Sequence, residues 1–454
     1  MDVIGKLLGR LAMLAGAALV LYLGVVIVAG TFAAVSQTEA QPPGAAGDLR
    51  NAKNNRALFL RGRRIFRFDT FGDEAFWGGA LQLQRAIAGR RNGGVGPGVS
   101  PRTALAVGLK VDAAAIPRRT AAAIKAGRVN LNDPKVTLAL LKLNAVVGVK
   151  GFFNRRGRLT SMGITCAVCH STVDDSFAPG IGRRLDGWPN RDLNVGAIIG
   201  LAPNKKPITD LLGVDEQTVD RVLASWGPGK FDAALFLDGK AFRPDGRTAA
   251  TLIPPAFGLA GVNLATYTGW GTVTYWNAFV ANLEMHGRGN FDDDRLDDAG
   301  QFPVAARNRF GHVRNRPDLI TPKLPALHFY QLAIPAPKPP RAYFNAAAAR
   351  RGRAVFNGKG QCQNCHMQPN GTQAGWNLVT PTDICTDAFT ASRSPTGRYR
   401  TTPLAGMFAR SKGGFYHDGR YPTLMSVVEH YNSCHNLNLT AREKADLVQY
   451  LRSR

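Results

Sequence analysis

The pentapeptide CAVCH at residues 166–170 recurs as CQNCH at residues 362–366, and these two stretches decide the fold. Each places two thiols three positions apart, with a histidine directly after the second thiol. Thiols at that spacing can reach both vinyl groups of one haem, and the adjacent histidine can bind its iron. The sequence therefore predicts two covalently attached haem c groups. The expected attachment residues are Cys166, Cys169, Cys362 and Cys365, and the expected iron ligands are His170 and His366.

Two other kinds of site also use a Cys-x-x-Cys pair, namely thioredoxin-like redox centres and zinc sites. The histidine that follows the pair in both copies argues against either alternative. The sequence also lacks further paired Cys or His residues at zinc spacing. Haem is thus the favoured interpretation of both motifs.

The N-terminal segment predicts export across a membrane. An uncharged run from Leu11 to Val35 follows the basic residues Lys6 and Arg10. The run exceeds the roughly 7–15 apolar residues of a secretory signal and is long enough to span a bilayer. We expect residues 1–36 to form an uncleaved inner-membrane anchor, with a cleaved signal as the alternative, and residues 37–48 to form a tether. The remaining chain would then lie on the periplasmic side.

The predicted compartment and the charge bear on partners and on the two remaining cysteines. Because the periplasm is oxidising, we expect a disulfide between Cys385 and Cys434, with two separate buried thiols as the alternative.

The formal net charge of +25 favours an anionic partner. The sequence shows no nucleic-acid-binding motif, so we expect a small redox carrier protein or a quinol-linked donor, together with the inner membrane.

The order of elements predicts a mainly α protein with long loops and two cytochrome c-like haem domains. Residues 341–454 contain a helix at Asn345–Phe356 before the second motif and a last helix from Thr440, capped with Glu443. These two helices resemble the crossing pair of a cytochrome c fold. Seven prolines in residues 317–340 exclude regular helix or central strand and predict a semi-rigid linker. Residues 49–316 would form the first haem domain with an N-terminal extension.

A similar passage follows each haem motif, which predicts an internal repeat. IPPAFGLAGV at 253–262 and an amphipathic stretch at 273–284 correspond to RTTPLAGMFA at 400–409 and PTLMSVVEHY at 422–431. Between these segments His417 aligns with Gly269. A histidine can bind haem iron from the distal side whereas a glycine cannot, so we expect an open first haem and a closed second haem. Met407 is the alternative distal ligand of the second haem.

Several other residues are candidates for the first haem site or for a metal. Trp270 and Trp276 are candidates for lining the first haem or relaying electrons, although most tryptophans simply pack. Met285 and His286 are candidates for capping that haem, with a surface histidine as the favoured interpretation of His286. Calcium is a candidate ligand of an acidic group, although its spacing differs from an EF-hand and favours a solvated loop. That group comprises Asp292, Asp293, Asp294, Asp297 and Asp298.

The haem motifs, the linker and the run YRTTPLAGMFARSKGGFYHDGRYPTLMSVVEHY at 399–431 resemble the bacterial di-haem cytochrome c peroxidase superfamily, which includes MauG and RoxA-type enzymes. The resemblance is concentrated in residues 341–454, above all in the Tyr-His-Asp-Gly element at 416–419. It implies a peroxidatic or oxygen-binding haem, an electron-transfer haem and often an interdomain calcium. This chain departs from the family at Gly397–Arg398, where those peroxidases commonly carry a Met ligand, and no residue matches their distal acid.

Three functions follow from these expectations. The favoured one is a peroxidase-type oxidoreductase with a catalytic first haem and an electron-transfer second haem. The alternatives are a non-catalytic, membrane-anchored electron-transfer relay and a RoxA-like haem oxygenase.

Overall fold

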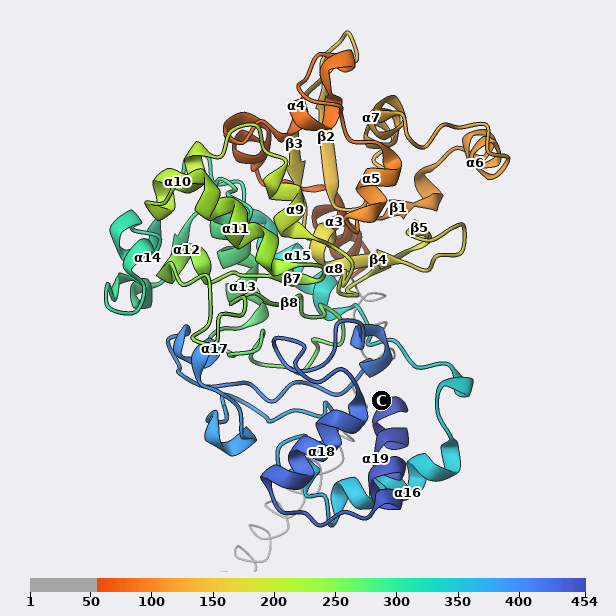
Figure 1. Cartoon of the computed structure of the whole chain (residues 1–454), viewed down its shortest axis with the longest axis vertical. Helices are drawn as coiled ribbons and strands as arrows, with labels where there is room; N and C mark the ends of the chain where they lie inside the picture. Colours follow the sequence, from red (N-terminus) through yellow and green to blue (C-terminus); the bar gives the residue numbers. More distant parts are fainter. Residues whose placement is uncertain (1–54) are drawn as a thin grey trace, which may run out of the picture. The chain divides into compact units, whose positions relative to one another are not determined.

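The computed structural model describes residues 55–454 (Figure 1). The expected anchor at residues 1–36 and tether at residues 37–48 lie outside these residues. Within residues 55–454, no helix combines the length and the apolar character that a membrane crossing requires. The described residues pack in one compact unit. We refer to residues 55–340 as the first region and to residues 341–454 as the second region.

The described chain is mainly helical, as predicted, and its strands form only short two-stranded sheets. The helices are α3 (Arg56–Phe68), α4 (Leu83–Ala88), α5 (Pro101–Ala106), α6 (Arg118–Lys125), α7 (Pro134–Lys142), α8 (Ala167–His170), α9 (Val195–Gly200), α10 (Lys206–Leu212), α11 (Glu216–Trp226), α12 (Leu235–Asp238), α13 (Val273–Phe279), α14 (Pro303–Asn308), α15 (Leu324–Leu332), α16 (Ala346–Asn357), α17 (Phe389–Ser392), α18 (Leu424–Cys434) and α19 (Ala441–Arg452). The strands pair as β1 (Val111–Asp112) with β5 (Ile181–Gly182), β2 (Val149–Phe153) with β3 (Leu159–Ile164), β4 (Ser171–Val173) with β6 (Arg184–Asp186), β7 (Lys230–Phe231) with β8 (Thr251–Leu252), and β9 (Phe291–Asp292) with β10 (His312–Val313). Only the β1–β5 pair is parallel.

The second region is built on the crossing of α16 and α19, which confirms both predicted helices. The side chain of Thr440 accepts from the backbone N–H of Glu443, whose own side chain returns to Thr440, so the predicted capping box is present. At the crossing, a Cβ on Gly352 would lie 2.0 Å from the backbone oxygen of Asp446. Only glycine therefore lets the two helices approach this closely.

The first region repeats this crossing with α3 and α15. A Cβ on Gly62 would lie 1.9 Å from the backbone oxygen of Ala326. Gly62 and Gly352 each stand between two arginines in the sequence, and each is followed four positions later by a fully buried phenylalanine, Phe66 or Phe356. The two regions therefore share one helix-crossing frame.

Helix α15 corrects the prediction for residues 317–340, which excluded regular helix. Pro325 occupies the first turn of α15, where the missing N–H has no intrahelical partner to lose. Ala326, Leu327 and Tyr330 of the helix are buried in the core that α3 completes. The middle of this proline-rich stretch is thus the closing helix of the first region, and the connector to α16 is correspondingly shorter.

The second region also contains the predicted disulfide. Cys385 and Cys434 are bonded, with their Cα atoms 5.9 Å apart. Cys434 is the last residue of α18, so the bond ties the loop after the second haem motif to that helix.

The internal repeat is confirmed, but its register differs from the alignment made on sequence. Antiparallel bridges Ala265–Gly271 and Phe415–Tyr421 close loops of equal length. In both loops the second residue has a positive φ, at 63° for Thr266 and 68° for Tyr416. The fifth residue of each loop is a positive-φ glycine, Gly269 or Gly419. The counterpart of His417 is therefore Tyr267, and the pairing of His417 with Gly269 is wrong.

The two loops face each other across the boundary between the regions. The backbone N–H of Leu252 donates to the carbonyl of His417 (2.7 Å), and that of Arg400 donates to the carbonyl of Tyr267 (2.8 Å). The rings of Tyr267 and His417 meet with centroids 6.3 Å apart. Equivalent loops thus make reciprocal contacts, as at an interface between two copies of one subunit.

A buried ion triad joins the regions beside these loops. Arg393 binds both carboxylate oxygens of Asp238 (2.7 and 2.9 Å) and both oxygens of Asp232 (3.0 and 3.1 Å). The three side chains are at most 3% exposed. Burial raises the pKa of Asp232 to about 6. The arginine therefore compensates two carboxylates that water does not reach.

We predict that Arg393→Met destabilises the haem-loaded protein by about 3–5 kcal/mol, because two buried carboxylates lose their cation. Urea unfolding at neutral pH measures the change. Arg351→Met is the control, since the Arg351 side chain is 48% exposed where it pairs with Asp446 and its replacement should give a smaller change. Adding Asp232→Asn and Asp238→Asn to Arg393→Met should recover part of the loss. Equal effects of Arg393→Met and Arg351→Met would refute the role of the triad.

Candidate functional site

The first Cys-x-x-Cys-His motif forms α8 and the residue before it, directly after β3. Its backbone is held by Gly187, whose N–H donates to the carbonyl of His170 (2.8 Å), and by Asn190, whose N–H donates to that of Cys169 (2.8 Å). A Cβ on Gly148 would lie 2.1 Å from the backbone nitrogen of Val168. The motif is thus packed tightly on its outer side while its side chains face inward.

These side chains line a cavity of about 370 Å³. The Nδ1 atom of His170 lies 3.1 Å from the carbonyl oxygen of Pro254, so Nδ1 carries the proton and Nε2 is left as a lone-pair donor. Burial lowers the pKa of His170 to about 4, which keeps the imidazole neutral. A neutral, oriented imidazole is the form that binds a metal.

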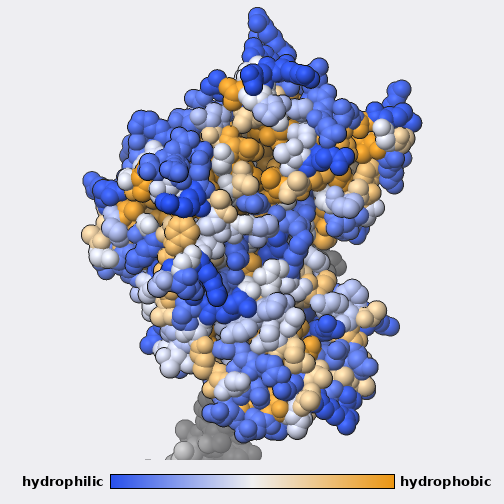
Figure 2. All heavy atoms as spheres, in the orientation of Figure 1, coloured by the Kyte–Doolittle hydropathy of each residue, from blue (hydrophilic) through white to orange (hydrophobic). Residues whose placement is uncertain are grey.

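The rest of the cavity wall is mostly apolar. It includes Leu83 and Ile87 from α4, Met162 from β3, and Ile198 and Ile199 from α9. Figure 2 shows apolar side chains gathered around the part of the surface where α4, β3 and α9 come together in Figure 1. An apolar cavity beside two thiols and an imidazole fits a covalently attached haem.

Two tryptophans form one wall of the cavity. The Trp270 and Trp276 rings are stacked, with centroids 5.2 Å apart, and both line the cavity. Their indole N–H groups find no hydrogen-bond partner within residues 55–454. Met285 also lines the cavity, whereas His286 stacks on Phe76 with ring centroids 3.7 Å apart. Trp270 therefore lines the cavity beside the first motif, and its role at a haem stays a prediction.

Glu284 is a further polar residue at the cavity, and the sequence analysis did not identify it. It ends the π-helical turn Val280–Glu284 that continues α13. Burial, followed by the nearby charge of Asp232, raises the pKa of Glu284 well above its usual range. Its Oε2 atom has no partner in the described part of the chain. The cavity wall thus contains a buried carboxyl group whose protonated form is favoured by burial.

We predict that Glu284→Gln stabilises the protein increasingly as pH rises. Because the folded-state pKa of Glu284 lies above its unfolded value, its contribution to stability is present at low pH and is lost with rising pH. Thermal unfolding at a series of pH values measures the difference. The free energies of unfolding of the wild type and Glu284→Gln should be similar near pH 4–5 and then diverge, by up to about 1.4 kcal/mol per pH unit.

Glu443→Gln provides a control of opposite sign for this pH series. Lys359 and the Thr440 backbone lower the pKa of Glu443, so that replacement should destabilise above the unfolded pKa. A pH-independent difference between Glu284→Gln and the wild type would show that Glu284 is ionised in the folded protein.

The second motif contains a short 3₁₀ turn at Cys362–Asn364. The Nδ1 atom of His366 lies 2.8 Å from the carbonyl oxygen of Gly371, which again leaves Nε2 as the lone-pair donor. Burial lowers the pKa of His366 to about 4. Cys362 packs against the core of the second region, and neither thiol of this motif is in a disulfide. The residues present therefore fit haem attachment at both motifs.

The two candidate distal ligands of the second haem differ in their surroundings. His417 is 3% exposed and stacks on Tyr399 with ring centroids 5.1 Å apart, and its Nε2 has no partner within the described residues. Met407 is also buried, but its sulfur accepts a hydrogen bond from Arg410 (3.0 Å). Buried polar atoms are normally hydrogen-bonded or bound to a ligand, and Nε2 of His417 has no such partner within residues 55–454, whereas the sulfur of Met407 already has a donor. His417 is therefore the better candidate for the distal ligand.

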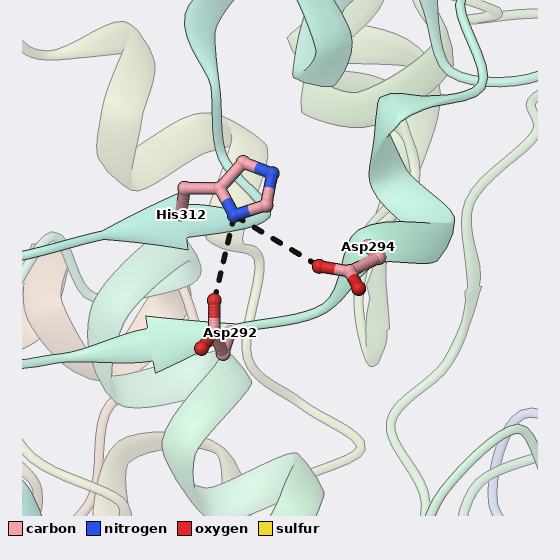
Figure 3. A group of neighbouring side chains, drawn as sticks. All are labelled: Asp292, Asp294 and His312. Carbon is pink, nitrogen blue, oxygen red and sulfur yellow. Dashed lines mark ion pairs between the residues drawn. The ribbon is translucent and has the colours of Figure 1, made fainter.

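The carboxylates of the acidic cluster pair with different basic side chains of the protein. Figure 3 shows Asp292 and Asp294 facing Nδ1 of His312, at 3.4 and 4.0 Å. Arg314 pairs with Asp292 (2.6 Å), and Asp293 turns inward to Arg295 and Tyr275. A histidine among these carboxylates is an unusual neighbour for calcium, which prefers oxygen ligands. Calcium stays a prediction.

Comparison with known proteins gives no family for this chain. No protein-family model matches it, and no curated protein matches it. Nine chains of solved structures match, among them a MauG-like protein associated with microbial copper homeostasis (TM-score 0.32, 16% identity), covering 48% of this chain and 78% of that one. Another is hydrazine synthase of Kuenenia stuttgartiensis (TM-score 0.24, 17% identity), covering 49% and 86%. These overlaps are too distant to assign a family.

Proposed function

We propose that the chain is a di-haem c-type oxidoreductase of peroxidase type. One observation at the first motif carries the proposal. The imidazole of His170, oriented so that Nε2 can bind a metal, faces an apolar cavity whose wall also contains the buried carboxyl group of Glu284. At the second motif the imidazole is equally oriented, and His417 supplies a candidate second ligand. One site is thus suited to bind a small oxidant and the other to transfer electrons.

A bound haem supplies one-electron redox chemistry and, where its sixth position is open, a place for peroxide or dioxygen. Reduction of hydrogen peroxide to two waters consumes two electrons and two protons. Glu284 is suited to provide a proton, because burial favours its protonated form and its Oε2 atom has no partner within residues 55–454. The surrounding apolar residues raise the cost of ionising that carboxyl group.

Aromatic side chains connect the two sites across the boundary between the regions. Tyr399 stacks on His417, which meets Tyr267 edge-on, and Tyr267 lines the first cavity. Such a chain of contacting rings offers a short route for electrons from the second haem to the first. The reciprocal backbone hydrogen bonds fix these rings relative to one another.

The proposals for the electron donor and the location rest on the sequence alone. We propose that the N-terminal segment anchors the chain at the periplasmic face of the inner membrane. The donor would be a small acidic redox carrier or a quinol-linked protein, because the net charge is +25.

One observation favours the electron-transfer relay as a second candidate. Tyr267, rather than a glycine, occupies the position equivalent to His417, and a tyrosine oxygen can bind haem iron. If both haems had two protein ligands, the protein would transfer electrons without binding an oxidant.

Electron paramagnetic resonance of the oxidised, haem-loaded protein distinguishes the two candidates. We expect one high-spin and one low-spin ferric signal, with the high-spin signal lost in Cys166→Ser/Cys169→Ser. His417→Ala should convert the low-spin signal to high spin, whereas the control Met407→Leu should leave it unchanged. Two low-spin signals, in both the oxidised and the half-reduced protein, would favour the relay.

We further expect Glu284→Gln to slow peroxide consumption by about 10²–10⁴-fold, because the amide cannot donate the proton that the carboxyl group supplies. Haem content and the resonance spectrum should stay as in the wild type, which separates proton transfer from haem binding. Glu443→Gln, on the surface of α19, serves as the activity control. Turnover by Glu284→Gln equal to that of the wild type would remove Glu284 from the mechanism.

A further inference from the structure

Three arginines gather where the two regions meet, and they lack an anionic partner. Arg191 comes from the first region, and Arg400 and Arg410 come from the second. Arg191 and Arg410 are each 7% exposed, and Arg400 lines the first cavity. Within residues 55–454, none of the three forms an ion pair with a carboxylate. We call these residues the arginine cluster.

The polar contacts of the arginine cluster are to neutral atoms. Arg400 donates through Nε to the carbonyl of Thr266 (2.6 Å), and Arg410 donates through Nη2 to the carbonyl of Pro403 and to the sulfur of Met407. Arg191 makes one long contact, at 3.5 Å to the carbonyl of Lys412, and its Nε has no partner in the described chain. Carbonyl oxygens satisfy hydrogen-bond donors but leave the three positive charges uncompensated.

The nearest acidic residue in sequence does not neutralise the cluster. Asp192 lies between Lys110, at 2.6 Å, and Lys412, so its charge is already shared by two ammonium groups. The contrast with Arg393 is direct, since Arg393 is equally buried and holds two carboxylates. Burial lowers the pKa of Arg410 to about 10, with contributions from the charges of Arg191 and Arg400. Buried guanidiniums that repel one another require anions that the described protein does not provide.

The cluster touches both proposed haem sites. Arg400 lines the cavity of the first motif, together with Tyr267. Arg410 donates to the sulfur of Met407 (3.0 Å), which belongs to the core against which Cys362 of the second motif packs. Each haem carries two propionate carboxylates, and a guanidinium can bind a carboxylate through two parallel hydrogen bonds.

We propose that the arginine cluster at the boundary of the two regions seats propionates of both haems, with Arg400 serving the first haem and Arg410 the second. This inference rests on the proposed di-haem function. Because Arg191 belongs to the other region, the carboxylates also join the two regions electrostatically. Haem attachment thereby neutralises a repulsion that the protein alone would carry across its internal boundary.

Reduction potentials of the individual haems test the proposal. A cation near haem iron favours the reduced, less positive state, so its removal should lower the potential of the haem that it faces. We expect Arg410→Gln to lower chiefly the potential of the second haem and Arg400→Gln chiefly that of the first, in spectroscopically monitored redox titrations. Arg351→Gln, which removes the same charge from the exposed surface of α16, should leave both potentials unchanged.

The dependence of these potentials on pH identifies the anion. Without its guanidinium, a buried propionate should take up a proton more readily, so the deficit in potential should shrink at low pH and widen as pH rises. The other charged or titratable groups around the cluster are Tyr267, His366, Asp192, Lys110 and Lys412. These groups are present in the wild type as well. The difference in potential between each variant and the wild type therefore reports only the loss of one guanidinium.

The outcomes separate this inference from the proposed function. A protein without two covalent haems would refute both. Two haems with unchanged potentials in Arg400→Gln and Arg410→Gln would refute the arginine cluster alone. A wild-type potential that shifts on adding inorganic phosphate would also refute it, because the cluster would then bind an exchangeable anion. If either glutamine variant fails to load haem, the lysine variants Arg400→Lys and Arg410→Lys should show smaller shifts in the same direction, and unchanged potentials there would again refute it.

Discussion

A buried imidazole must place one nitrogen against an acceptor if the other is to remain a free lone pair, and both haem motifs meet this requirement with a backbone carbonyl. Pro254 provides it for His170 and Gly371 for His366. A backbone acceptor cannot rotate away or change its protonation, so the orientation of each ring is set by the course of the chain. The segments that supply these carbonyls, and the loops packed on them, are therefore constrained together.

That constraint connects the haem motifs to the boundary between the regions. Leu252 lies two residues before Pro254, and its N–H donates to the carbonyl of His417 in the other region. The equivalent bond from Arg400 reaches Tyr267. Each region thus helps to fix the segment that completes the other site, and His417 with Tyr267 lies at the centre of the arrangement. A change at this boundary is expected to affect both sites at once.

Local signals in the sequence predicted much of the second region, because its determinants are short in range. The haem motif, the capping box of Thr440 and Glu443, and the helix from Asn345 each depend on residues within a few positions of one another. The disulfide depended on the expected compartment and on there being only two remaining cysteines. These predictions required no knowledge of how distant segments pack.

The predictions that failed depended on position within an element or on distant packing. Prolines in residues 317–340 were treated alike, although Pro325 lies in a first turn that tolerates it. The sequence alignment of the repeat paired His417 with Gly269, whereas the loops closed by the bridges Ala265–Gly271 and Phe415–Tyr421 pair His417 with Tyr267. Glu284 was overlooked because its burial arises from a π-helical turn and from cavity walls far away in sequence. Because α15 ends at Leu332 and α16 begins at Ala346, every element of the first region from α3 onward precedes the second region in the chain, so the first region is synthesised before the second is complete. The first motif can then be enclosed by a complete fold before the second motif has been synthesised, so the two sites would form in the order of the chain.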